Sequence, residues 1–281
     1  MACPIRSAFP ALVTRLAAID LGSNTIRLLV VETSGAGEWR ALDQFQAITR
    51  LGERLAADSG LAEPAMKRTV DAVAKCCARA ESLGAGEVLI VATSAVREAR
   101  NRDTFLDLVH RTTGREVRVV SGEEEARLVL LGALHGLEIR SGSLLLMDIG
   151  GGSTEFVLAR DGAVVSAVSL PLGVVPRTER YMTEDPVDWN RYAEMARAVR
   201  DRLAREALPS FSGPRPDSML GTAGTVTALA ALDQDLPAYD SEKVHGYVIA
   251  RHRIERLLAR LGAMPVAARA ALPCLEPGRA D

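Results

Sequence analysis

Two short turns carry residue types that suit the binding of phosphate groups. Residues 21–25 read LGSNT and residues 150–154 read GGGST. Glycine has no Cβ atom, so the backbone N–H groups of such turns can approach an anion closely, and adjacent hydroxyl and amide side chains offer further hydrogen bonds. A third segment, LGTAGT at residues 220–225, begins a predicted helix whose N-terminal amides favour anions. Each turn alone could serve only to form a hairpin, but the three together favour a ligand with several phosphate groups.

Carboxylates occur beside the first two turns. Asp20 and Asp148 each close the apolar run before a turn, and Glu155 follows the second turn. Carboxylates would repel a phosphate ligand unless a divalent cation lay between them, and hard oxygen ligands of this kind suit Mg²⁺. We therefore expect Asp148 and Glu155 to hold Mg²⁺, with Asp20 in the corresponding place beside the first turn. An aspartate at a turn often only caps backbone amides, and we expect that role for one of the three.

Other charged residues are less specific. The run Glu123 to Glu125 lies at a predicted helix start, where the helix dipole favours acidic residues by about 0.3–1 kcal/mol each. Spacing alone does not select one of these glutamates for catalysis. Arg97 follows a predicted buried strand at residues 86–93, and from there it can project into a cleft.

The hydrophobic pattern supplies the elements that would position these residues. Strands are predicted at residues 16–20, 26–32, 38–50, 86–93 and 117–120, and helices at 62–84, through Phe105 and Leu108, and at 123–137. The pattern then begins again, with three strands within 143–170, a helix over 186–208, a linker at 210–217, a strand, turn and helix over 217–232, and a last helix at about 254–261. Strands that alternate with helices indicate a partly parallel sheet covered by helices. The repetition predicts two similar halves that face each other across a cleft, with the boundary near residues 136–142.

Composition narrows the function. The 281 residues include 34 Lys and Arg against 36 Asp and Glu, so no global basic field exists to hold nucleic acid or an anionic membrane. No apolar run approaches the ~20 residues of a membrane helix, residues 1–15 are interpreted as a loose extension, and we expect a cytoplasmic protein. The cysteines and histidines lack zinc-site spacing. The P-loop, dinucleotide-binding and G-x-S-x-G motifs do not occur in the sequence.

Six motifs, taken in order, resemble those of one family: AAIDLGSNTIRLLVVE, VATSAVREARN, VVSGEEEARLVLLGAL, LLLMDIGGGSTEFVLARDG, SLPLGVV and LGTAGTVTALAAL. They are similar to the exopolyphosphatase/guanosine pentaphosphate phosphohydrolase (Ppx/GppA) family of the sugar kinase, Hsp70 and actin superfamily, from about Leu16 to the C-terminus. The resemblance implies an α/β fold with two ribonuclease-H-like domains around a hinged cleft, at residues 16–138 and 139–281. It also implies Mg²⁺-dependent removal of a terminal phosphoryl group from inorganic polyphosphate, from pppGpp or from both, and hence a connection with the stringent response.

The same resemblance assigns roles to individual residues. Glu125 is similar in position to the family's catalytic base, and Asp148 and Glu155 match its metal-associated carboxylates. The residues expected to bind substrate are Asp20, Gly22, Ser23, Asn24, Thr25, Arg97, Gly150, Gly151, Gly152, Ser153, Thr154, Gly221 and Thr222. Two other interpretations stay open, an ATP-dependent kinase or ATPase of the same superfamily and a non-catalytic sensor of polyphosphate or nucleotide. A homodimer is open as well.

The end of the chain departs from the family pattern. Longer members carry a further helical domain of the HD type, for which this chain has no room, so the resemblance is to the short form. Short members usually continue past a segment like LPCLEPGRAD with an apolar helix that returns to the first domain, whereas this sequence stops at Asp281. We therefore expect either a truncated chain or a fold that closes differently. We also expect short polyphosphate or pppGpp to be preferred to long chains.

Overall fold

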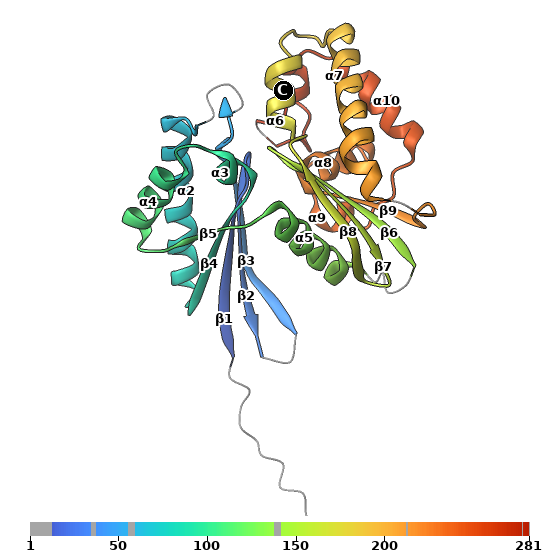
Figure 1. Cartoon of the computed structure of the whole chain (residues 1–281). Coiled ribbons are helices and arrows are strands. Elements are labelled where there is room, and N and C mark those ends of the chain that lie inside the picture. The colour runs from blue at the N-terminus through green and yellow to red at the C-terminus, as the bar shows by residue number, and fades with distance from the viewer. Residues whose placement is uncertain are drawn as a thin grey trace, which may run out of the picture.

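The computed structural model describes residues 13–34, 38–55, 60–137, 142–211, 213–276 and 278–280. Within these residues the chain forms two β-sheets that stand beside each other, each with its own helices (Figure 1). The strand order is β3-β2-β1-β4-β5 in the first sheet and β8-β7-β6-β9 in the second.

The first sheet joins antiparallel hairpins to parallel strands. Its strands are β1 (Thr14–Leu21), β2 (Thr25–Thr33), β3 (Trp39–Ile48), β4 (Glu87–Ala92) and β5 (Val117–Val119). β2 runs antiparallel to both β1 and β3, whereas β4 runs parallel to both β1 and β5. A parallel pair needs a long crossover, and helix α2 (Glu63–Ser82) supplies the one that leads to β4.

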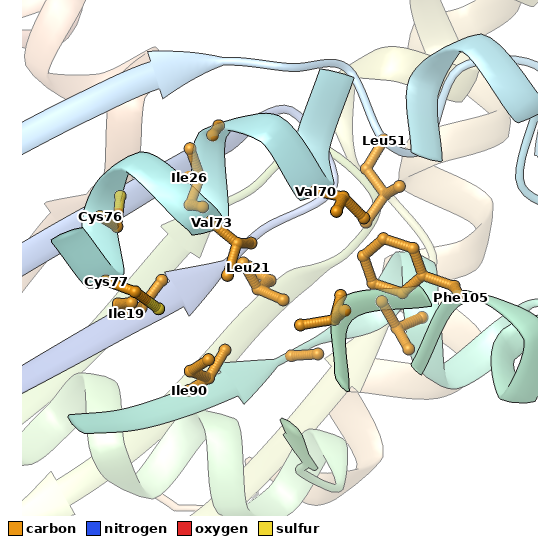
Figure 2. Packing of buried hydrophobic residues seen from close by; sticks show 14 of the residues in the cluster. Ile19, Leu21, Ile26, Leu51, Val70, Val73, Cys76, Cys77, Ile90 and Phe105 are labelled. Carbon is orange, nitrogen blue, oxygen red and sulfur yellow. The ribbon is translucent and has the colours of Figure 1, made fainter. Parts of the chain in front are cut away.

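One face of this sheet forms the main hydrophobic core. Helices α2 and α4 (Arg102–Thr113) cover that face, where Ile19, Leu21, Val73 and Phe105 are buried in one cluster (Figure 2). Successive side chains of a strand point to opposite faces, so Asp20, between Ile19 and Leu21, is directed away from the core. The packing of β1 therefore fixes which side of the sheet carries its acidic residue.

The second sheet repeats the arrangement of the first. Its strands are β6 (Ser143–Ile149), β7 (Thr154–Arg160), β8 (Ala163–Leu170) and β9 (Ser218–Thr222). β7 is antiparallel to both β6 and β8, and β6 is parallel to β9. Both sheets thus have the order and strand directions of a ribonuclease-H-like sheet, which confirms the α/β fold class expected from the motifs.

Helix α5 (Gly122–Gly136) packs on the second sheet. Its residues Ala126 and Leu130 are buried in one cluster with Leu144 of β6 and Val157 of β7. The domain boundary expected between residues 138 and 139 assigns α5 to the first domain. The structure differs from this expectation, because the apolar side of α5 is covered by β6 and β7. The division itself falls within residues 138–141, which lie outside the described residues.

The helices of the second half differ in part from the predicted ones. They are α6 (Val174–Tyr181), α7 (Trp189–Arg202), a π-helical turn (Leu203–Ala207), a 3₁₀ turn (Leu208–Ser210), α8 (Ala223–Asp233), α9 (Ser241–Val244), α10 (Arg251–Gly262) and α11 (Val266–Ala270). The single helix predicted over 186–208 is wrong at its start, and its last turns are π-helical and 3₁₀ rather than α-helical. Asp188 accepts a hydrogen bond from the Asn190 backbone N–H and so caps α7 at a later start, and Pro209, which has no N–H, ends the regular helix in a 3₁₀ turn.

The N-terminal extension is only partly described. β1 begins at Thr14, inside the range 1–15 that we expected to be loose, and residues 1–12 lie outside the described residues. In the part of the chain that the structure describes, none of the helices combines the length and the apolar character needed to cross a membrane.

Candidate active site

The two glycine-containing turns meet each other. A Cβ atom placed on Gly151 would lie 2.8 Å from the Asn24 backbone nitrogen, and one on Gly152 would lie 2.5 Å from the Ser23 Oγ atom. Both separations are shorter than van der Waals contact, so only glycine fits at this approach without a shift of its neighbours. The ends of β1 and β6, and with them Asp20 and Asp148, therefore converge on one place.

The first turn is held by the segment that follows β3. The Gly52 N–H donates to the Ser23 carbonyl oxygen at 2.8 Å, and the Thr49 and Arg50 N–H groups both donate to the Asn24 carbonyl oxygen at 3.0 Å. Bound in this way, the carbonyl groups of the turn point toward residues 49–52. Within the turn, the Gly22 N–H donates to the Thr25 carbonyl oxygen at 3.1 Å.

The start of α6 holds the second turn. The backbone N–H groups of Gly173, Val174 and Val175 donate to the carbonyl oxygens of residues 152, 150 and 151, at 3.0, 3.0 and 2.9 Å. A Cβ atom on Gly173 would lie 2.2 Å from the Gly152 carbonyl carbon, so this packing also depends on glycine. The helix start thereby fixes the glycine turn, which gives the SLPLGVV segment a structural role.

A cavity of about 410 Å³ lies beside the two turns, between the sheets. Twelve of the residues singled out in the sequence line it. They are Asp20, Gly22, Ser23, Asn24, Thr25, Glu125, Asp148, Gly150, Gly151, Gly152, Ser153 and Glu155. The same cavity is lined by Arg27, Ala223, Gly224, Thr225 and Arg279, and by apolar residues of β1, β4 and α5.

Strand register arranges the charged side chains of the cavity in rows. Asp20 on β1 is paired with Arg27 on β2, and Arg27 is paired with Gln46 on β3. In the second sheet Asp148 on β6 is paired with Glu155 on β7. Residues paired in register lie side by side on the same face. The row of the first sheet therefore includes a cation, and Arg27 Nη1 lies 3.6 Å from Asp20 Oδ2.

Of the three consecutive glutamates only Glu125 lines this cavity. Glu123 forms an exposed ion pair with Arg127 one turn along the helix, and Glu124 pairs with Arg118 of β5. The Ser121 hydroxyl accepts a hydrogen bond from the Glu124 N–H and so caps α5. The cap sets the rotation of the helix start, which cannot be predicted from sequence spacing. This rotation directs Glu125 into the cavity and leaves Glu123 and Glu124 in contact with solvent.

The environment of Glu125 makes its carboxyl group a weak acid. Burial raises the pKa of Glu125 to about 7, and the charge of Glu155 acts in the same direction. An ion pair with Arg97, 2.9 Å from Nη1 to Oε2, opposes this rise. A carboxylate with a pKa near neutrality is suited to general-base catalysis.

Asp148 and Glu155 are also perturbed. Burial raises the pKa of Asp148 to about 6, against the influence of Arg27. Burial likewise raises the pKa of Glu155, although its carboxylate accepts a hydrogen bond from the Ser169 hydroxyl at 2.7 Å. The site thus concentrates more negative charge than its own cations neutralise.

The donor set of the site fits a hard divalent cation. Asp148 and Glu155 are adjacent carboxylates that line the cavity, and burial, together with repulsion from neighbouring carboxylates, raises their pKa values. In the ranges that the structure describes, no three His, Cys, Asp or Glu side chains come close enough to hold a metal ion by themselves. Mg²⁺ commonly takes only one or two protein carboxylates and completes its octahedron with water and phosphate oxygens, so a pair is sufficient.

Four residues expected to bind substrate do not line this cavity. Arg97 lies on the short helix α3 (Ser94–Glu98) and donates to Glu125 and to the Val120 carbonyl oxygen. Its guanidinium is therefore directed to the acidic residue rather than to the cavity, in contrast to the expected phosphate contact. The Thr154 hydroxyl donates to the Leu172 carbonyl oxygen, Gly221 packs beneath Val226, and Thr222 lines an adjoining cavity.

Two cations of the cavity were missed in the sequence. Arg27 lies on the same face of the sheet as Asp20, so a strict use of the strand period would have found it. Arg279 comes from the C-terminal segment, where its Nε atom donates to Glu276 and its Nη2 atom lies 3.5 Å from the Thr25 hydroxyl. No local pattern indicates that position, because only the tertiary fold brings residue 279 to the first turn.

The fold defines a protein of the actin, Hsp70 and sugar kinase superfamily, in which two ribonuclease-H-like sheets present glycine turns to one cleft. Residues 30–281 match the model of the Ppx/GppA phosphatase family, and the chain belongs to this family.

Individual relatives agree with this assignment. The chain is 35% identical over 276 residues to exopolyphosphatase 2 of Mycobacterium tuberculosis, covering 95% of this chain and 86% of that protein. It is 30% identical over 266 residues to exopolyphosphatase 1 of Mycobacterium bovis, covering 95% and 77%. A crystal structure of the Aquifex aeolicus Ppx/GppA family member matches with a TM-score of 0.77 at 29% identity, covering 95% of this chain and 85% of that one. An exopolyphosphatase from Cytophaga hutchinsonii matches with a TM-score of 0.87 at 25% identity, covering 95% and 86%.

The contact between α6 and the second turn leads to a stability prediction. We expect Gly173→Ala to lower the free energy of unfolding by about 1–3 kcal/mol, because the added methyl group must displace the backbone of the turn. Gly132→Ala on α5 is the matched control, since a Cβ atom there has no neighbour within 4 Å and we expect a gain of roughly 0.5–1 kcal/mol. Urea unfolding followed by circular dichroism measures both, and equal values for the two variants would contradict the prediction.

Proposed function

We propose that this protein is an exopolyphosphatase that hydrolyses the terminal phosphoanhydride bond of inorganic polyphosphate, of pppGpp or of both, by Mg²⁺-assisted in-line attack of water. The observation that carries the proposal is that Glu125, whose pKa is raised to about 7, lines the same cavity as both glycine turns. The names of the mycobacterial relatives support a phosphoanhydride hydrolase. The location that we propose is the cytoplasm.

The residues of the cavity divide the work of such a reaction. The Gly22 and Gly150 N–H groups are hydrogen-bonded within the turns, and the other backbone N–H groups of the turns donate to the phosphate oxygens of the chain. Arg27 and Arg279 add positive charge on the side of the first turn. Positioning and charge neutralisation are the main contributions in phosphoryl transfer, because the transition state spreads charge over the transferred group.

Glu125 supplies the acid–base step. Its carboxylate accepts a proton from a water molecule aligned with the scissile bond, and Arg97 holds the carboxylate by its Oε2 atom during this step. Asp148 and Glu155 would hold the divalent cation. When bound there, Mg²⁺ neutralises charge on the substrate phosphates.

One assay tests the proposal directly. Phosphate release is measured from short polyphosphate, long polyphosphate, pppGpp and ATP, each with and without Mg²⁺. We expect Mg²⁺-dependent release from short polyphosphate or pppGpp. Release from ATP alone, with transfer to an acceptor, would identify a kinase or ATPase instead, and binding without any release would identify a sensor.

The role of Glu125 is tested by Glu125→Gln. The amide cannot accept the proton, so we expect kcat to fall by about 10²–10⁴-fold while substrate still binds, as measured by calorimetry. Glu123→Gln is the matched control, because that side chain lies one turn away in an exposed pair with Arg127. Near-normal turnover by Glu125→Gln would reject the assigned role.

Arg97 is tested through the pH profile. Its positive charge favours the ionised form of Glu125, so Arg97→Ala should raise the pKa of Glu125 further. As the pH falls, a base with a higher pKa is protonated, and so inactivated, at a higher pH. We therefore expect the acid limb of the kcat/KM profile to move to higher pH, with activity recovering in alkaline buffer. Arg97→Lys keeps the charge and should shift the limb less. A uniform loss at every pH would contradict this role for Arg97.

A further inference from the structure

A second cavity, of about 340 Å³, adjoins the one that holds the phosphate turns. Arg27, Asp148, Gly224 and Arg279 line both cavities, so the two are continuous at the arginine side chains. A ligand whose phosphates lie against the turns could extend past the arginines into this second space. The remaining walls of the second cavity therefore determine what the other end of the ligand can be.

Those walls include an exposed aromatic ring. Tyr239 lies between α8 and α9, lines the cavity, and is 40% exposed. Other exposed aromatic residues have ring partners: Trp39 stacks on His135, and Trp189 meets the edge of another ring. Within the described residues, Tyr239 has no ring contact and no hydrogen bond. Its ring face is thus available to a ligand.

The floor of the cavity is polar. Gln46 and Glu276 are hydrogen-bonded to each other through the amide nitrogen and a carboxylate oxygen, and both line the cavity. An amide and a carboxylate beside an aromatic face are the groups that bind the polar edge and the π face of a nucleobase. An inorganic phosphate chain has no group that stacks on a ring.

A third cavity, of about 280 Å³, also reaches Gly224 and Arg279. Its walls combine aliphatic residues such as Leu229, Leu261 and Leu275 with charged side chains, and among the residues that the structure describes no aromatic one lines it. It offers no stacking surface. The second cavity is therefore the better receptor for a base.

We propose that Tyr239 is a specificity-determining residue that stacks on the base of a nucleoside 5′-polyphosphate while the phosphates occupy the turns. This inference rests on the proposed function and adds the nucleoside subsite to it. Selectivity between nucleotide and inorganic substrates is then set by the second cavity, whereas the cleavage chemistry belongs to the first.

The experiment compares pppGpp with tripolyphosphate, which lacks a nucleoside. In Tyr239→Ala we expect the ratio of kcat/KM for pppGpp to kcat/KM for tripolyphosphate to fall about tenfold, mainly through KM for pppGpp, since stacking of one base on an aromatic side chain has an effect of that size. Tyr239→Phe keeps the ring and should keep the ratio. Tyr192→Ala is the matched control, because that aromatic residue packs on Trp189, away from the cavity.

The possible outcomes distinguish the stacking role of Tyr239, the nucleoside subsite and the proposed function from one another. An unchanged ratio in Tyr239→Ala, or an equal fall in Tyr239→Phe, would overturn the stacking role. If the wild type cleaves tripolyphosphate but pppGpp is neither cleaved nor a competitive inhibitor, the nucleoside subsite is rejected and exopolyphosphatase activity stands. If the wild type cleaves neither substrate, the proposed function itself fails, and this inference fails with it.

Discussion

The close approach of two backbone turns is the constraint on which the site depends. Gly151 and Gly152 lie against Ser23 and Asn24 at distances that leave no room for a Cβ atom. Because each turn directly follows a buried strand, contact between the turns fixes the distance between the strand ends. Those strand ends carry Asp20 and Asp148. Because the glycines of the second turn have no side chains, the turns approach closely enough for carboxylates from both sheets to line one cavity.

The repeated architecture gives the two halves different electrostatic roles. Asp20 and Asp148 occupy equivalent ends of β1 and β6, but the residue paired with the first is Arg27 and the residue paired with the second is Glu155. One half therefore presents a cation beside its aspartate and the other a second carboxylate. A twofold repeat with identical residues would present the same charges from both halves and would lack this difference.

The sequence was informative where local rules decide the structure. Strand alternation and glycine turns predicted both sheets and eleven residues of the cavity, and the family resemblance added Glu125. Rotation of a helix start and contacts between distant segments do not follow local rules. The cap of α5 separates Glu125 from its acidic neighbours, α3 redirects Arg97, and the fold brings Arg279 beside the first turn. Helix α6 was also missed, since its eight residues include a proline and its role is visible only from its bonds to the second turn.

The cluster of buried carboxyl groups lowers the free energy of unfolding at neutral pH, and the direction of this effect follows from the linkage between protonation and folding. A carboxyl group whose pKa is raised in the folded state binds more protons there than in the unfolded chain between the two pKa values. For Glu125, raised from 4.5 to about 7, the folded state therefore loses stability as the pH rises through that interval. Arg97 reduces this loss without removing it, since the pKa of Glu125 stays raised. A ligand that brings positive charge to the site favours the ionised carboxylates, so binding and proton release are coupled. The same excess of negative charge that lowers the stability of the folded state therefore favours the binding of positive charge at Glu125, Asp148 and Glu155.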